Sequence, residues 1–401
     1  MKKALSVLLS CLLIFACVSP CFAGTSEQGM KFREDGTFTI LHLTDSQDDH
    51  NPAWDMLNLV KRSIEESDPD LIIFTGDIVE DSRIGDLGID AEPGREGVTV
   101  ENIKGEVVYD KTRANIEKAV DALFTVLEDS GVPYVICQGN NDHKCGITNE
   151  DWLEIYAKYP NCRVVDESDD ADGRIDYNIF INGADGTPKF NIWCMDTGRG
   201  GMNADQIEWY KNRSAAITEA NGGNVVPALL FQHIHVADIG NLFEPCHSWD
   251  DGAEAIGAKF YRLNRNIAKG NNYFAYEPGI TTEEFTAWKE SGDVIGAFFG
   301  HQHVEGFSGV WDGIELGFTY GCEFAKTGPY GYRVITLHED DVKNYDNEQF
   351  VYTGKVKLGT DKISPLKEDK VPAFDNSVLK FFNQVKNFML ILVKLIKGLI
   401  G

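Results

Sequence analysis

Six short runs of almost continuously apolar residues constrain the fold of this 401-residue chain more than any other feature. Runs of this length and composition are typical of β-strands that have both faces covered by other layers of the protein. They therefore predict a layered domain with buried strands. The runs are residues 38–45, 70–77, 133–140, 190–196, 227–233 and 294–301.

Helical patterns separate several of these runs. Apolar residues repeat at helical spacing within residues 54–66 and again within residues 114–128. Strands that alternate with helices predict an α/β fold. Farther along, residues 313–321, 332–338 and 350–358 read as strand after strand with no helix between them, which predicts a second, more antiparallel sheet.

A polar, glycine-rich segment, residues 81–113, interrupts this alternation. We interpret it as a long insertion between a strand and the helix that begins near residue 114. Loops of this length are often functional. A solvated excursion without function explains the composition equally well, so both interpretations stay open.

The N-terminus has the features of a secretory signal peptide. Two lysines precede an apolar core, and the letters CFA before Gly24 resemble a cleavage site, so residues 1–23 are the predicted signal peptide. The short core disfavours a membrane anchor, and the residues before Cys17 and Cys21 fit lipidation poorly. We therefore expect a secreted or cell-surface protein. In such a location cysteines can form disulfides, but the sequence does not show which cysteines pair.

The C-terminus has a different character. A polar linker, residues 361–375, precedes residues 376–401, whose apolar side chains fall on one helical face and are interrupted by lysines. A basic amphipathic helix of this kind suits a membrane surface or the groove of a partner. Docking on the protein's own core is the alternative.

Charge narrows the classes of partner. The formal net charge is -26, and such an acidic protein repels nucleic-acid phosphate, so we expect no charge-driven binding to nucleic acid. A site for an anionic substrate would need local positive charge. Metal ions are a compact way to supply it.

Five of the apolar runs end in side chains that can bind metal. A single histidine after a strand is usually structural, but the same arrangement at five strand ends favours one shared site at the edge of a sheet. Histidine and carboxylate together suit Zn, Mn or Fe. The candidates are Asp45 and Gln47, then Asp77, then Asn140, Asn141 and His143, then His233, and finally His301 and His303.

The order of these motifs resembles the calcineurin-like metallophosphoesterase superfamily over roughly residues 36–340. The stretch NADQIEWYKN at residues 203–212 and the runs that follow it resemble the purple-acid-phosphatase-like branch. The resemblance implies an α/β fold of four layers, an α/β/β/α sandwich of two mixed sheets. We expect this metallophosphoesterase domain to cover residues 30–360.

The resemblance also implies two metal ions, with Asp77 as the bridging ligand. Asp45 and His303 would hold the first ion. The second would be held by Asn140, His233 and His301. The ions are divalent or trivalent (Mn, Zn or Fe), and the sequence does not choose between them. Two cations can clamp a phosphate ester and lower the pKa of the attacking water.

Three positions depart from the family pattern, and one of them is Glu80, which stands where the purple enzymes carry a Tyr. Gln47 stands where the first motif usually has His, and an amide oxygen there would be a weaker ligand. Asn141 replaces a His that assists the leaving group, and Asn can donate a hydrogen bond but not a proton. His143 could substitute for it or could be a surface residue. The loss should matter least for esters with good leaving groups.

The resulting prediction is an extracytoplasmic phosphoesterase that acts on phosphorylated small molecules or other phosphoesters through a metal-activated water. The alternative, suggested by Gln47 and Asn141, is a protein that binds metal or phosphate ligands without turnover. If the domain were purely structural, the ordered positions of seven candidate metal ligands would be a coincidence. Substrate, metal identity and oligomeric state remain open.

Overall fold

The computed structural model describes residues 30–80, 109–168, 173–324, 328–352 and 365–367. The predicted signal peptide and the predicted C-terminal helix lie outside these residues, as does most of the predicted insertion and linker. Within the described part of the chain, no helix is both long enough and apolar enough to cross a membrane.

One sheet has six strands, in the order β17-β16-β15-β2-β3-β4. Strands β2, β3 and β4 are parallel, and β15 runs antiparallel between β2 and β16. The short β17 pairs with β16, so this sheet continues past the predicted domain boundary at residue 360. The bounds are β2 Thr37–Leu43, β3 Leu71–Thr75, β4 Tyr134–Cys137, β15 Tyr330–His338, β16 Asp346–Tyr352 and β17 Pro365–Lys367.

The other large sheet has eight strands, in the order β1-β5-β6-β7-β12-β14-β13-β11. Its centre, β6 to β14, is parallel, while β5, β13 and β11 run antiparallel to a neighbour. The bounds are β1 Met30–Lys31, β5 Tyr177–Asn182, β6 Pro188–Met195, β7 Ala228–Gln232, β11 Ala268–Asn271, β12 Val294–Phe299, β13 Gly306–Trp311 and β14 Ile314–Phe318.

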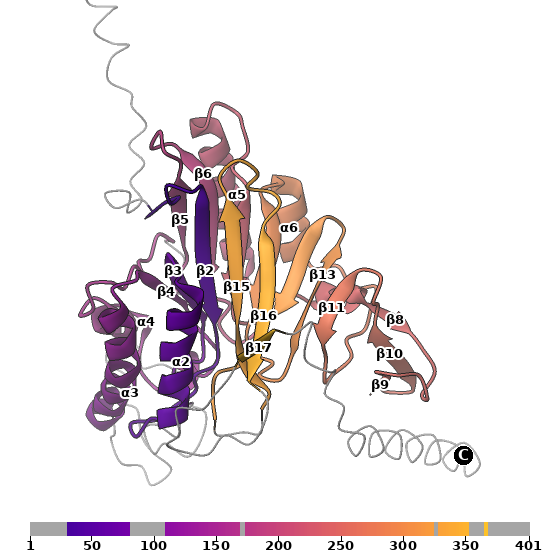
Figure 1. Cartoon of the computed structure of the whole chain (residues 1–401), viewed down its shortest axis with the longest axis horizontal. Helices are drawn as coiled ribbons and strands as arrows, with labels where there is room; N and C mark the ends of the chain where they lie inside the picture. The colour runs from indigo at the N-terminus through magenta and orange to yellow at the C-terminus, as the bar shows by residue number, and fades with distance from the viewer. Residues whose placement is uncertain (1–29, 81–108, 169–172, 325–327, 353–364, 368–401) are drawn as a thin grey trace, which may run out of the picture.

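Helices cover the outer faces of the two sheets (Figure 1). Apolar side chains of α2 and α3 belong to the core that contains β2, β3 and β4. Those of α5 and α6 pack in a second core with β6, β7 and β12. The resulting layers confirm the predicted α/β sandwich of two mixed sheets. The bounds are α2 Trp54–Ser67, α3 Tyr109–Ser130, α4 Asn149–Tyr156, α5 Ala204–Ala220 and α6 Glu283–Ser291.

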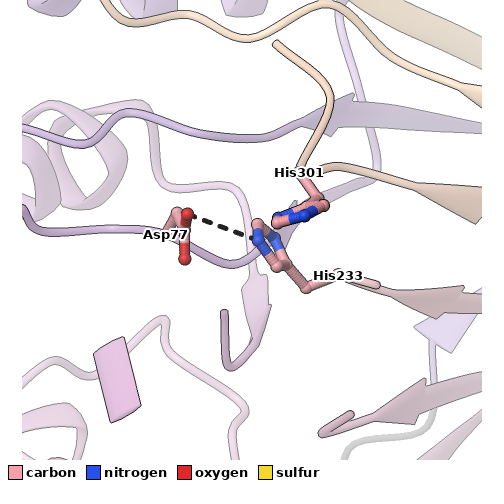
Figure 2. Close-up of side chains that lie close together, drawn as sticks. All are labelled: Asp77, His233 and His301. Atoms are coloured by element: carbon pink, nitrogen blue, oxygen red, sulfur yellow. Dashed lines mark ion pairs between the residues drawn. The ribbon is translucent and has the colours of Figure 1, made fainter. Parts of the chain in front are cut away.

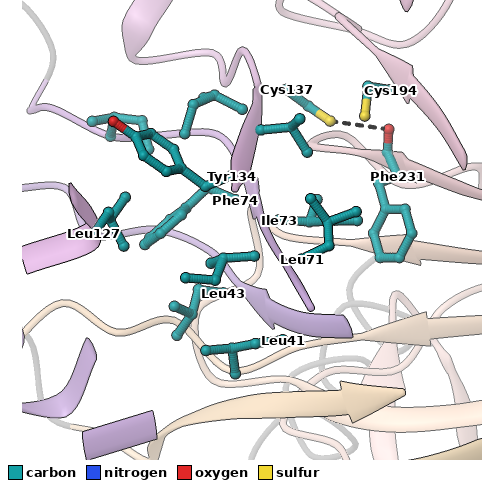
Figure 3. Packing of buried hydrophobic residues seen from close by; sticks show 14 of the residues in the cluster. Leu41, Leu43, Leu71, Ile73, Phe74, Leu127, Tyr134, Cys137, Cys194 and Phe231 are labelled. Carbon is teal, nitrogen blue, oxygen red and sulfur yellow. Dashed lines mark hydrogen bonds between the residues drawn. The ribbon is translucent and has the colours of Figure 1, made fainter. Parts of the chain in front are cut away.

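The two sheets meet through buried apolar side chains (Figure 3). Cys137 at the end of β4 donates a hydrogen bond to the carbonyl of Phe231 in β7, with an Sγ–O distance of 3.3 Å. Cys194 in β6 lies opposite Phe231 in the β6–β7 ladder. All three residues are fully buried. The contact fixes the end of β4 against the middle of the other sheet.

All six apolar runs form strands, as predicted, but the later strands were assigned wrongly. β14 joins the eight-stranded sheet beside β12, whereas β15 and β16 extend the six-stranded sheet beside β2. They therefore do not form a separate sheet. The error arises because periodicity identifies a strand but not its partner, which depends on contacts far along the chain.

A small three-stranded sheet was not predicted. It has the order β8-β10-β9 and stands apart from the sandwich in Figure 1. It follows the short 3₁₀ helix η4, Ala237–Leu242, which begins soon after β7 ends. The segment is too short and polar to show a strong period. Its strands are β8 Phe243–Pro245, β9 Glu254–Ile256 and β10 Lys259–Leu263.

Candidate metal centre

The carboxyl ends of five strands from the two large sheets bring the predicted ligands together. Asp45 follows β2, Asp77 follows β3 and Asn140 follows β4, all in the six-stranded sheet. In the eight-stranded sheet, His233 comes directly after β7 and His301 comes soon after β12. In parallel strands these ends share one edge, which is where open α/β sheets bind their ligands.

Two glycines allow the loops after β3 and β4 to approach closely. A Cβ atom on Gly76 would lie 2.4 Å from the backbone nitrogen of Gly139, and one on Gly139 would lie 2.1 Å from that of Asp77. Gly76 also has a φ of +78°, which side chains disfavour. Substitution at either position would push Asp77 and Asn140 apart.

The backbone is strained at this edge. Asp45, Gln47, Asp77 and His301 have φ values of 52°, 39°, 51° and 70°. They are four of the six non-glycine residues with positive φ in the described part of the chain. Such conformations cost about 1–3 kcal/mol each and persist where the surrounding structure enforces them, often at functional sites.

Two groups of ligand atoms share Asp77. Atoms of Asp77, His233 and His301 lie within 4.8 Å of one another, as do atoms of Asp45, Asp77 and His303. Figure 2 shows the first group, with both imidazoles on one side of the Asp77 carboxylate. One carboxylate between two sets of donors is the arrangement needed to hold two cations side by side.

Asp77 is fully anchored by donors. Its Oδ1 accepts a hydrogen bond from the backbone nitrogen of Asn141 at 2.8 Å. Its Oδ2 accepts from the side-chain amides of Asn141 and Gln47, both at 2.9 Å, and lies 3.3 Å from Nε2 of His233. The carboxylate therefore has a fixed orientation before any cation binds.

His233 presents a defined nitrogen to the site. Its Nδ1 lies 2.6 Å from the carbonyl oxygen of Thr75, which can only accept, so Nδ1 carries the proton. The Nε2 atom then faces Oδ1 of Asn140 at 3.1 Å and the Asp77 carboxylate. A hydrogen bond from the distal nitrogen is how proteins orient a metal-binding imidazole.

His303 is oriented in the same way by Glu323. Its Nδ1 contacts a carboxylate oxygen of Glu323, and its Nε2 lies 3.3 Å from Oδ1 of Asp45. Glu323 is 4% exposed and was not among the predicted residues, because it lies 20 positions after His303 and belongs to no motif. The contact between Glu323 and His303 is visible only in the folded chain.

Asp45 shows that the donor set fits a cation. Its Oδ2 accepts from Thr44 Oγ1 at 2.7 Å and from the backbone nitrogen of His301 at 3.0 Å. Its Oδ1 is buried and has no hydrogen-bond partner among the described residues, although it faces Nε2 of His303. A buried carboxylate oxygen that accepts no hydrogen bond is costly unless a positive charge lies beside it, and a bound cation would supply that charge.

The electrostatics of the imidazoles agree with this role. Burial, and then the neighbouring His233, lowers the pKa of His301 to about 4, so its ring is a neutral donor at neutral pH. Burial also opposes charge on His233, but the Asp77 carboxylate raises the pKa of His233 to about 9. A cation bound to Nε2 would take the place of that proton.

Residues 39–180 match the family model described as "Metallophosphoesterase, calcineurin superfamily". Over these residues the chain is similar to the calcineurin-like metallophosphoesterase superfamily. The chain is also 24% identical to "Probable inactive purple acid phosphatase 14" of Arabidopsis thaliana, over 82% of each chain. It is also 23% identical to "Probable inactive purple acid phosphatase 29" of that plant, over 81% of this chain and 80% of the relative.

A solved structure can also be compared. A dimetal phosphatase from Danio rerio aligns with 82% of this chain and 98% of its own, with 12% sequence identity and a TM-score of 0.45.

Two of the three departures from the metallophosphoesterase pattern, Gln47 and Asn141, contact Asp77. Gln47 uses its side-chain nitrogen as a donor to the carboxylate, although we predicted that its oxygen would bind a cation. Asn141 donates to both Asp77 oxygens, through its backbone and its side chain. Both amides thus hold the shared carboxylate in place, a contact that the sequence did not suggest.

His143 belongs to neither group of ligand atoms. It lies in the 3₁₀ helix η3, Asp142–Lys144, and its Nε2 is 2.6 Å from Oδ1 of Asp196. Its side chain is only 12% exposed, so it is not an ordinary surface residue. Asp196 directly follows β6 and is the last residue of the apolar run at residues 190–196.

Proposed function

We propose that the protein hydrolyses phosphate esters at a centre of two metal ions. The observation that supports this most is the pair of ligand groups that share Asp77. The match of residues 39–180 to the metallophosphoesterase family model supports phosphoester chemistry, and the shared carboxylate supplies the anion that two neighbouring cations require. The substrates would be phosphorylated small molecules or other phosphoesters.

The ligands divide between the ions as follows. Asp45 and His303 would hold the first ion and Asn140, His233 and His301 the second, with Asp77 between them. Gln47 would contribute to the first ion only if its amide turned its oxygen inward, and oxygen and nitrogen of an amide are assigned from the hydrogen bonds. The mixture of imidazole and carboxylate suits Mn, Zn or Fe.

The residues of this chain would set the geometry of the reaction. When bound, the two cations would polarise the phosphoryl group and lower the pKa of the attacking water. Asn141 donates hydrogen bonds to both oxygens of Asp77 and so fixes the carboxylate that the two ligand groups share. Thr75 and Glu323 hold Nδ1 of His233 and of His303, so that Nε2 of each ring is the atom that would bind a cation.

The predicted location remains part of this proposal. The signal-peptide features of residues 1–23 support action outside the cytoplasm, and residues 376–401 would contact a membrane surface. Both segments lie outside the described residues. An acidic enzyme in this location would meet its substrates at the cell surface or in the surrounding medium.

A second candidate function is cation or phosphate binding without turnover. It is favoured by Asn141, which cannot give a proton, and by the word "inactive" in the names of the two plant relatives. The two candidates share the metal centre and differ only in catalysis. One experiment therefore separates them.

The full mature chain is loaded separately with Mn, Zn and Fe and assayed on an aryl monoester, an aryl diester and a nucleotide. Asp77→Asn is the test variant, and Asp205→Asn, an exposed position in α5, is the matched control. We expect metal-dependent turnover that falls at least 1,000-fold, roughly, in Asp77→Asn only. Two bound ions without turnover on any ester would instead establish the binding function.

A further inference from the structure

His143 and Asp196 form a hydrogen-bonded pair that joins the two sheets. His143 belongs to the turn after β4 in the six-stranded sheet, and Asp196 follows β6 in the eight-stranded sheet. The distance between Nε2 and Oδ1 is 2.6 Å. Nothing in the arrangement of metal ligands requires this pair.

The pair lies beside the metal centre. In the parallel β6–β7 ladder Met195 pairs with Gln232, so the next residues, Asp196 and His233, leave neighbouring strands side by side. On the other side, His143 lies two residues after Asn141. Asn141 donates hydrogen bonds to both carboxylate oxygens of Asp77. The imidazole is therefore held between the loops that carry ligands of the second cation.

Asp196 is a fixed, ionised acceptor. It is fully buried, yet backbone nitrogens of Ile175 and Gly198 donate to its two oxygens at 3.2 and 2.9 Å, and the amide of Asn149 lies at 3.4 Å. Burial alone would raise the pKa of Asp196, but His143 and these donors lower it. A carboxylate held by so many donors imposes one orientation on His143.

His143 has the properties of a proton donor. Burial lowers its pKa, but Asp196 outweighs burial and the net pKa lies above the ordinary value. The charged groups that face the ring are Asp196 after β6, Asp142 on its own turn and Arg174 before β5. Nε2 is engaged by Asp196, whereas no described residue bonds to Nδ1, and 12% of the side chain remains exposed.

We propose that His143 protonates the leaving group and that Asp196 is its positioning residue, so that the site accepts alkyl phosphate esters. This inference rests on the proposed function. Alkoxides are poor leaving groups and need a proton as they depart, whereas aryl oxides leave without much help. A catalyst built only for aryl esters would have no use for an imidazole that is oriented by a buried carboxylate here.

The step balances as follows. Water attacks phosphorus, the bond between phosphorus and the alkyl oxygen breaks, and its electron pair goes to that oxygen. The Nδ1 proton of His143 passes to the same oxygen, which leaves as an alcohol. The attacking water gives up one proton, which restores His143 through solvent, so ester and water become alcohol and phosphate.

The test compares 4-nitrophenyl phosphate with glycerol 2-phosphate on the fully metal-loaded chain. His143→Gln should lower kcat for the alkyl ester by about 100- to 10,000-fold and for the aryl ester by about tenfold or less. His338→Gln is the matched control, because His338 forms an exposed pair with Asp346 at 2.9 Å, and it should change neither rate. Equal losses on the two esters would overturn the inference.

Asp196→Asn provides a second, independent reading. Because His143 must be protonated to act, alkyl-ester activity should fall as pH rises through its pKa, and the fall should move to lower pH in Asp196→Asn. Nitrogen-15 NMR of the metal-free protein should show the same downward shift in the titration of His143, by about one unit or more. An unchanged titration would also overturn the inference.

These outcomes separate the two proposals. A wild-type chain that carries two ions and hydrolyses neither ester defeats the proposed function, and the inference falls with it. Turnover of the aryl ester alone by the wild type leaves the phosphoesterase standing and overturns the role of His143.

Discussion

The six-stranded sheet and the eight-stranded sheet contribute different chemistry to the metal centre. The candidate ligands on the first are oxygens, from Asp45, Asp77 and Asn140, whereas those on the second are the imidazoles of His233, His301 and His303. The oxygen donors sit in loops shaped by glycine and strain. The nitrogen donors are oriented by single acceptors, Thr75 and Glu323 in the two cases that the hydrogen bonds define.

The difference follows from the geometry of the donors. A carboxylate or amide can rotate about one bond and accept several donors, so backbone and side-chain amides can fix it from many directions. An imidazole has two nitrogens, and when one binds a cation the other needs exactly one acceptor. We call the ligands of the six-stranded sheet the oxygen half of the centre and those of the eight-stranded sheet the nitrogen half. The oxygen half should therefore tolerate the loss of one supporting hydrogen bond better than the nitrogen half.

The largest expected effect is loss of a nitrogen ligand itself. His233→Asn should remove one of the two ions and lower turnover by more than about 100-fold, since a bound imidazole is worth more than its supports. His247→Asn, an exposed histidine after β8, is the control. Elemental analysis counts the ions, and retention of two ions at unchanged affinity would contradict the assignment.

Loss of the acceptor behind a nitrogen ligand should have an intermediate effect. Glu323→Gln keeps the shape of the side chain but removes its charge. Because Glu323 orients His303, the variant should lower the affinity for one ion by about 10- to 100-fold. Competition with a coloured chelator measures this affinity. The exposed Glu348→Gln serves for comparison, and equal affinity in both variants would show that His303 needs no support.

The smallest expected effect on cation affinity belongs to a support of the oxygen half. Asp142 accepts from the backbone nitrogens of Ile78, Val79 and Gly139 at 2.9, 3.2 and 2.8 Å and so ties the loops after β3 and β4 together. Asp142→Asn replaces one acceptor by a donor. It should lower stability by about 1–3 kcal/mol and affinity by less than about tenfold.

Urea unfolding of the variant, measured beside Asp205→Asn, tests the first part of this prediction, and chelator competition tests the second. A loss of affinity as large as that of Glu323→Gln would remove the contrast between the two halves. Unchanged stability would show that the three backbone donors find another acceptor.

Residues that act locally could be predicted, and those that act through the fold could not. Each strand end that carries Asp45, Asp77 or His233 is visible as an apolar run that stops at a ligand. Glu323 and Asp196 contact His303 and His143 from distant segments, so no pattern in the sequence links them. The neighbours of β15 were misassigned for the same reason, because strand pairing is a long-range contact.

The division of ligands between two sheets has a consequence for heat resistance. Cations that bind oxygens of one sheet and nitrogens of the other bind only while the two layers stay in contact, and any ion that prefers the folded chain stabilises it by mass action. The melting temperature of this protein should therefore depend on the free metal concentration around it. The supply of ions around the folded chain would then set how long the molecule survives.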